Sequence, residues 1–253
     1  QVIAGRALTK IAATLIKTPE NARARASGTG VPDELIGRTV MIDLATWNLS
    51  VPVGSPPYTV ETSKLVDGCK DQYFHSDTGT LFFWSPVTGS KTEYAIYPRT
   101  ELRETYSNGT LRNWYYPDAD NLLRATLAVN KVPSSGKIVI GQIHAYESQK
   151  PMLKLEYQYK TKTETGNLVI KVRMRPDDEE SRVITLATGV KLDREFNYLI
   201  HLSPGGALGV RRNGTERDRQ HGGAARDRRA EDGVHHGARR GRWNLRPESY
   251  SAR

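Results

Sequence analysis

Three charged residues alternate along the segment "RTELRET", and their spacing indicates a site for an anion. If this segment is a β-strand, Arg99, Glu101 and Arg103 point to one face and the intervening residues point to the other. Two guanidinium groups around one carboxylate can hold a planar anionic group by charge-assisted hydrogen bonds, with Glu101 orienting the arginines. A solvated edge strand with a ladder of weak ion pairs has the same pattern. The segment alone leaves both interpretations open.

A second pair of candidate residues lies in "VIGQIHAY". Gln142 and His144 share one face of this segment when it is extended. The amide of a glutamine can donate a hydrogen bond, and an imidazole can transfer a proton near neutral pH. A histidine beside a glutamine is also common as a purely structural residue.

Two later segments carry polar residues on one face and apolar residues on the other. The polar positions are Lys154, Glu156, Gln158 and Lys160 in the first segment, and Lys171, Arg173 and Arg175 in the second. In one sheet, these faces would form a concave surface rich in basic groups, which suits an acidic polymer.

The elements that must position these residues are short strands. Between residues 41 and 210 the apolar residues recur with a period of two, in "LFFWSPV", "NLLRATLAV", "KIVIGQIHAY", "LKLEYQYK", "NLVIKVRMR" and "FNYLIHLS". Turn sequences such as "SDTG", "SNGT" and "VPSSG" separate them. This pattern, without helices between the strands, predicts an all-β fold, an antiparallel β-sandwich or jelly roll.

The charge lies at the two ends of the chain. The 253 residues include 37 Lys and Arg against 28 Asp and Glu, a net charge of +9. Residues 41–210 carry 19 basic and 19 acidic side chains, whereas residues 211–253 carry twelve Arg and six acids. Because the middle is neutral, the total charge does not indicate nucleic-acid binding by the folded part. One cysteine, Cys69, excludes an internal disulfide and a zinc site built on several thiolates.

The two ends are predicted to differ from the middle. Apolar residues at helical spacing predict a helix over residues 3–16, and a linker rich in Gly, Pro and Ser follows up to residue 40. No apolar run has the length of about 18 residues that a membrane-spanning helix needs, and no signal peptide is visible. Residues 211–253 contain few large apolar side chains, which predicts disorder. The alternatives for this tail are a basic arm for nucleic acid, a solvated tail, or a segment translated in a shifted reading frame.

The two motifs together resemble a known family. "YPRTELRE" followed by "GQIH", with "DLATWNLSVPVG" and "NWYYPDADNLLRATLAV", resembles the alginate lyases of polysaccharide lyase family seven over about residues 42–210. The resemblance implies a concanavalin-like jelly roll whose concave groove binds acidic polysaccharide. It also implies cleavage by β-elimination, without a metal or other cofactor.

The resemblance assigns roles to the candidate residues. Arg99, Gln142 and His144 would surround the uronate carboxylate as catalytic residues, with His144 taking the C5 proton of guluronate. The substrate-binding residues would be Glu101, Arg103, Lys154, Lys171 and Arg173. We expect a monomer that binds alginate with a tilt toward polymannuronate and does not bind nucleic acid. Since the polymer lies outside the cytoplasm, we expect secretion or a periplasmic location.

One family motif is missing from the printed chain. The family carries a strand of the form Tyr-Phe-Lys-Ala-Gly near its C-terminus, with a following tyrosine as catalytic acid, and residues 211–253 contain no match. The alternative function is therefore a jelly roll that binds acidic glycan without cleaving it, with one sheet edge left open. A nucleic-acid-binding protein that uses the Arg-rich tail is a third hypothesis.

Overall fold

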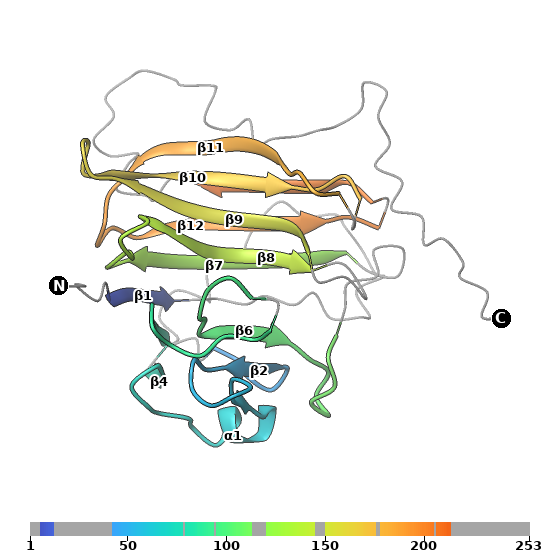
Figure 1. Cartoon of the computed structure of the whole chain (residues 1–253). Helices are drawn as coiled ribbons and strands as arrows, with labels where there is room; N and C mark the ends of the chain where they lie inside the picture. Colours follow the sequence, from blue (N-terminus) through green and yellow to red (C-terminus); the bar gives the residue numbers. More distant parts are fainter. Residues whose placement is uncertain are drawn as a thin grey trace, which may run out of the picture.

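β-Strands dominate the structure, a computed structural model (Figure 1). It describes residues 6–12, 42–77, 79–93, 95–112, 120–144, 150–175, 178–204 and 206–213. The described strands form three sheets, and all of their pairings are antiparallel. Among the described residues, one short helix, α1 (Thr62–Val66), follows the strand β3 (Thr59–Val60).

The largest sheet has six strands. Their order is β13 (Leu208–Asn213), β12 (Phe196–Leu202), β7 (Asn121–Val129), β1 (Arg6–Ala12), β5 (Thr80–Pro86) and β4 (Phe74–Asp77). The second sheet has the order β11 (Arg182–Val190), β10 (Thr165–Val172), β9 (Pro151–Lys160) and β8 (Lys137–His144). The third has the order β3 (Thr59–Val60), β2 (Trp47–Ser50) and β6 (Glu101–Glu104).

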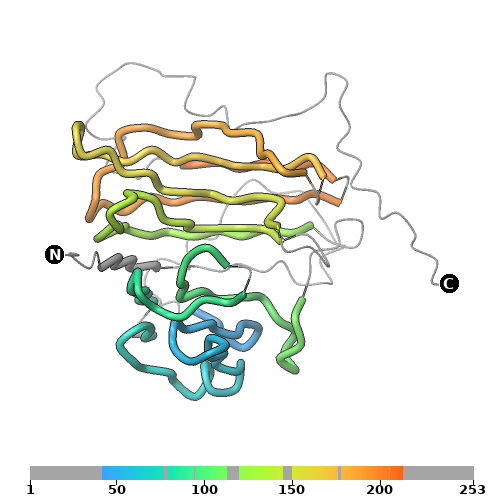
Figure 2. The backbone as a smooth tube through the Cα atoms, viewed as in Figure 1, coloured from blue at the N-terminus to red at the C-terminus, as the bar shows by residue number. Residues whose placement is uncertain are grey.

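The main core lies between the four-stranded sheet and one end of the six-stranded sheet. Leu153, Leu155 and Tyr157 of β9 pack in one cluster with residues such as Leu127 of β7 and Ile200 of β12. These positions alternate with polar ones along each strand, so one face of each sheet enters the core. Figures 1 and 2 show the two layers, with β8 to β11 overlying β7 and β12. The predicted antiparallel sandwich is confirmed.

A second cluster lies under the smaller sheet. Leu49 of β2, Val60 of β3 and Leu65 of α1 pack with Phe74 of β4 and Leu81 of β5. Leu102 of β6 also packs against this cluster. The alternate residues of β6 therefore point away from the core, as the pattern of "RTELRET" predicts.

The N-terminal helix predicted over residues 3–16 is wrong for the described part of that segment. Arg6–Ala12 form β1, which pairs with β5 on one side and with β7 on the other. Two flanking strands form hydrogen bonds with the backbone groups of this short segment. An isolated helix of this length would be only marginally stable. This segment therefore belongs to the six-stranded sheet and not to a separate extension.

The predicted domain end after Val210 also needs correction. β13 runs to Asn213 and pairs with β12, so Arg211 and Arg212 belong to the sheet. The predicted linker before residue 41 and the predicted disordered tail from residue 214 lie outside the described residues. In the parts that the structure describes, no helix is long and apolar enough to cross a membrane.

Candidate active site

The carboxylate of Glu101 connects the two predicted motifs. Arg99 Nη1 donates to Glu101 Oε2 at 3.1 Å, and the amide of Gln142 donates to the other oxygen, Oε1. The side chains of Arg99 and Glu101 are 38% and 28% exposed, so solvent reaches the pair. Arg99 and Gln142 are thus fixed beside each other although 43 positions separate them in sequence.

The position of Glu101 follows from the pairing of β6 with β2. Leu102 lies opposite Leu49, which is fully buried, and Glu101 lies opposite Ser50 at the end of β2. Because neighbouring residues of a strand point to opposite faces, burying Leu102 turns Glu101 away from the core. Arg103 shares the face of Glu101 by alternation and is exposed. That Glu101 orients the guanidinium group of Arg103 stays a prediction.

β8 supplies Gln142 and His144. Gly141 lies opposite Leu155 of β9, and Gln142 lies opposite Lys154. Gly141 and Leu155 are thus on the core face of the sheet, and Gln142 and Lys154 are on the face of the candidate site. The register shifts between Ile143 and His144, which is an irregularity of the kind that re-aims side chains at the end of a strand.

Tyr198 supports the backbone of β8 from the other sheet. Its hydroxyl group donates to the carbonyl oxygen of Ile140 at 2.5 Å. Burial raises the pKa of Tyr198 far above its ordinary value, so the hydroxyl group keeps its proton and donates this bond. The sequence does not predict this support, because it depends on which strands face each other across the core.

Lys154 of β9 lies near three other basic residues, which are Lys171 of β10, Arg173 just after β10, and Arg99. Lys154 lies opposite Lys171, and the charges of Lys171, Arg173 and Arg99 all act on Lys154. Burial is the largest effect that lowers the pKa of Lys154, and these cations lower it further, whereas Glu156 opposes them. The structure thus brings the predicted substrate-binding residues Lys154, Lys171 and Arg173 to the same region as Arg99.

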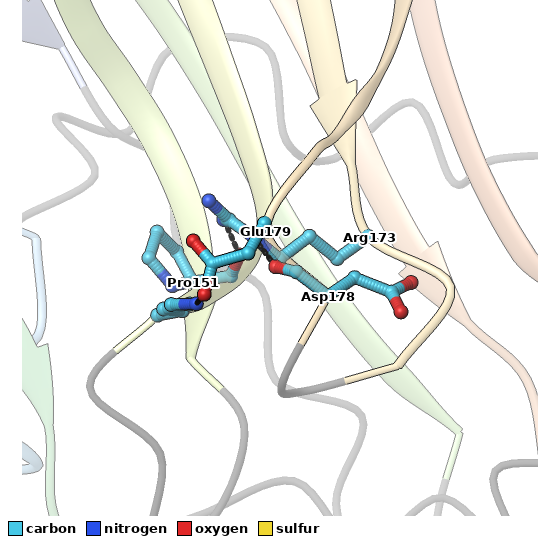
Figure 3. Close-up of polar contacts among 5 residues, drawn as sticks. Pro151, Arg173, Asp178 and Glu179 are labelled. Carbon is cyan, nitrogen blue, oxygen red and sulfur yellow. Dashed lines mark hydrogen bonds and ion pairs between the residues drawn. The ribbon is translucent and has the colours of Figure 1, made fainter.

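Arg173 is bonded to the backbone. Its Nη1 donates to the carbonyl oxygen of Pro151 at 2.7 Å, and its Nε donates to that of Asp178 at 2.9 Å (Figure 3). Lys150 lies beside this group and forms an ion pair with Glu179 at 2.5 Å. Arg173 therefore connects the start of β9 with the segment between β10 and β11, and two of its five N–H donors are engaged.

The sequence places Glu156 on a polar face of its strand and gives it no role in the site. Its side chain is 8% exposed and forms an ion pair with Lys171 Nζ at 2.9 Å. Gln158 donates to its other oxygen at 2.8 Å. The alternation of β9 indicates the face of Glu156, but its burial depends on Lys171 of a neighbouring strand. In the part of the chain described, no group of three His, Cys, Asp or Glu side chains has an arrangement suited to a metal ion.

The comparisons with known proteins agree with this fold. A family model described as alginate lyase matches residues 42–243. The match runs beyond Val210, where the sequence interpretation expected the likeness to end. Comparison with curated proteins finds no match.

Solved structures give the same result. The crystal structure of an alginate lyase from Pseudomonas aeruginosa is 43% identical, with a TM-score of 0.65 over 68% of this chain and 78% of the other. The family 7 alginate lyase A1-II', solved with a product, is 30% identical, with a TM-score of 0.59 over 68% of this chain and 75% of the other. An alginate lyase from Klebsiella pneumoniae, at 24% identity and a TM-score of 0.61 over 69% of this chain and 78% of the other, shares the fold.

The fold and these matches define a β-sandwich polysaccharide lyase. The chain belongs to the alginate lyases of polysaccharide lyase family seven, and the predicted jelly roll is confirmed.

Proposed function

We propose that this chain cleaves alginate by β-elimination at the Arg99–Glu101–Gln142 cluster and leaves 4,5-unsaturated uronate ends, with a preference for polymannuronate. The bridge from Glu101 to both Arg99 and Gln142 is the observation that carries the proposal. It fixes a guanidinium group and an amide side by side, and both can donate to one carboxylate.

The chemistry explains why such donors are needed. The proton at C5 of a uronate is weakly acidic while the neighbouring carboxylate keeps its negative charge. Donors fixed at the carboxylate stabilise the enediolate-like intermediate, in which negative charge moves onto the carboxylate oxygens. Arg99 and Gln142 take this role, and Glu101 keeps their donors in place. A base takes the C5 proton, and the electron pair left at C5, first delocalised onto the carboxylate, then forms the C4–C5 double bond as the C4–O bond breaks and the leaving oxygen takes up a proton. For mannuronate, the family resemblance implies that the catalytic tyrosine makes both proton transfers, first as base and then as acid.

His144 and the basic residues complete the proposed site. His144 shares a strand with Gln142 and removes the C5 proton when the sugar is guluronate. Arg103, Lys154, Lys171 and Arg173 add positive charge around the cluster, which favours the approach of a polyuronate. Because residues 41–210 carry equal numbers of basic and acidic groups, this local charge has to supply the attraction.

The second candidate function is binding of acidic glycan without cleavage. It is favoured by the absence of a Tyr-Phe-Lys-Ala-Gly motif from the printed sequence. Without the catalytic tyrosine that follows this motif, no group is assigned to protonate the leaving oxygen. Loss of a positioned acid lowers a rate by about 10²- to 10⁴-fold.

One experiment separates the two candidates. The printed chain and a version that ends in the tyrosine-bearing strand are each incubated with polymannuronate and polyguluronate, and the absorbance of unsaturated uronate is followed. We expect binding by both proteins, slow product formation by the printed chain and product formation about 10²- to 10⁴-fold faster by the second, in both cases faster on polymannuronate than on polyguluronate. No product from either protein, with binding retained, would favour the binding function. Product from polyguluronate alone would contradict the proposed preference.

A further inference from the structure

Two lysines stand side by side on the polar face of β9 and β10. Lys154 and Lys171 are directly opposite each other in the antiparallel register, so their Cβ atoms lie about 5 Å apart. Like charges at such positions repel each other unless an opposite charge compensates them. The carboxylate of Glu156 lies near both lysines.

Glu156 is bonded to only one of the two lysines. Its Oε1 pairs with Lys171 Nζ at 2.9 Å, and its Oε2 accepts a hydrogen bond from Gln158 at 2.8 Å. The carboxylate is almost completely buried. Withdrawing one partner of a buried ion pair strongly destabilises the folded protein, because the other charge is left uncompensated. Lys171 is therefore held against the sheet, and turning it toward a ligand would leave Glu156 without its cation.

Lys154 has different surroundings. No hydrogen bond or ion pair joins its ammonium group to another residue that the structure describes, whereas Arg99, Lys171 and Arg173 each have at least one such partner. It is about half buried and lies within the field of all three cations. An ammonium group in this position gains most from an anion that arrives from solution, because burial has removed part of its own hydration.

Lys154 is also placed beside the proposed carboxylate site. It lies opposite Gln142 on β8, one strand away from the amide that contacts Glu101. A polymer whose carboxylate is bound by Arg99 and Gln142 would bring the carboxylate of its next sugar toward this position.

We propose that Glu156 is a positioning residue that withholds Lys171 from the substrate and leaves Lys154 to bind the carboxylate of the neighbouring uronate. This assignment rests on the proposed function and refines it. It divides two lysines that are equivalent in the sequence pattern into one that contacts substrate and one that is bonded internally.

The test measures the affinity of the full chain for mannuronate oligomers by titration calorimetry at neutral pH. Lys154→Met should weaken binding by about tenfold or more, the usual loss for a charge-assisted hydrogen bond, and Lys154→Arg should restore most of it. Lys171→Met should weaken binding by less than about threefold, because its charge is already paired. Lys162→Met, in the exposed turn between β9 and β10, is the matched control and should bind like the unmutated chain.

Glu156→Gln gives the sharper prediction. Freeing Lys171 should tighten binding by about threefold, and the second change Lys171→Met should remove this gain. A purely structural role of Glu156 would lower thermal stability and affinity together, and the double variant would not cancel a gain. Equal losses for Lys154→Met and Lys171→Met, or weaker binding by Glu156→Gln, would overturn the assignment alone. An unmutated chain that binds no uronate oligomer would overturn the proposed function and this assignment with it.

Discussion

Tyr198 on β12 reaches across the core and touches Gly141 on β8. A Cβ atom added at Gly141 would lie 2.8 Å from the hydroxyl oxygen of Tyr198 and 3.1 Å from its Cζ. Both distances are shorter than an ordinary contact between such atoms. The glycine of "GQIH" is therefore required by packing, since the buried tyrosine occupies the space where a side chain would begin. This contact also fixes the strand that presents Gln142.

Gly141→Ala should disturb both the core and the site. We expect the free energy of unfolding to fall by about 1–3 kcal/mol, as for overpacked cores, and the affinity for alginate oligomers to fall with it. Gly209→Ala is the matched control, because a Cβ added at Gly209 meets no atom within 4 Å. It should change the stability by less than about 0.5 kcal/mol. Urea unfolding of both variants checks this, and equal stability of the two would contradict the packing argument.

The affinity for oligomers should depend on the protonation of Lys154. The ammonium form binds a carboxylate, and burial together with Lys171, Arg173 and Arg99 lowers the pKa of Lys154 against the opposing effect of Glu156. As the pH rises through this lowered pKa, the charge is lost, and affinity should fall at a lower pH than for an exposed lysine. Titrations between about pH 7 and 10 should show this fall in the unmutated chain and in Lys162→Met. The same alkaline fall in Lys154→Met would assign it to another group.

Arg173→Gln should act mainly on stability. The change removes the hydrogen bonds to the carbonyl oxygens of Pro151 and Asp178. We expect a loss of about 1–3 kcal/mol in the free energy of unfolding, the range for bonds made by a charged group. Arg175→Gln, at an exposed position two residues away, is the control and should have little effect. A loss of oligomer affinity greater than that of Lys154→Met, with unchanged stability, would show that Arg173 itself contacts the polymer.

The sequence predicts those parts of the fold that depend on local alternation. The residues Leu153, Leu155 and Tyr157 alternate with polar ones, and the structure buries all three. The prediction of a helix in the N-terminal segment is wrong because "RALTKIA" is compatible with both a helix and a strand. Its pairing with β5 and β7 decides between them. β11 and β13 were also missed. β11 has an irregular register with β10, which weakens its alternation.

The prediction of the candidate site has the same limit, because only contacts within one segment follow from the sequence. The contact of Arg99 with Glu101 follows from positions two apart in the sequence, just before and at the start of β6. The contact of Gln142 with Glu101 joins strands of different sheets, and the burial of Glu156 depends on Lys171 of the next strand. Neither can be derived from one strand, because strand order and register are tertiary properties. The family resemblance implies that Arg99 and Gln142 lie at one uronate carboxylate, and it assigns no role to Glu156.

The most direct test of the account is the rate at which unsaturated uronate appears after the two donors are changed. In a version of the chain that ends in the tyrosine-bearing strand, Arg99→Lys keeps the charge but loses the planar guanidinium group, and Gln142→Ala removes the amide donor. We expect each change to lower the rate on polymannuronate by at least about tenfold, in line with the loss of a donor that stabilises a developing anion. Rates equal to that of the unmutated protein in both variants would show that the carboxylate is stabilised elsewhere, and the assignment of the active site to Arg99, Glu101 and Gln142 would be wrong.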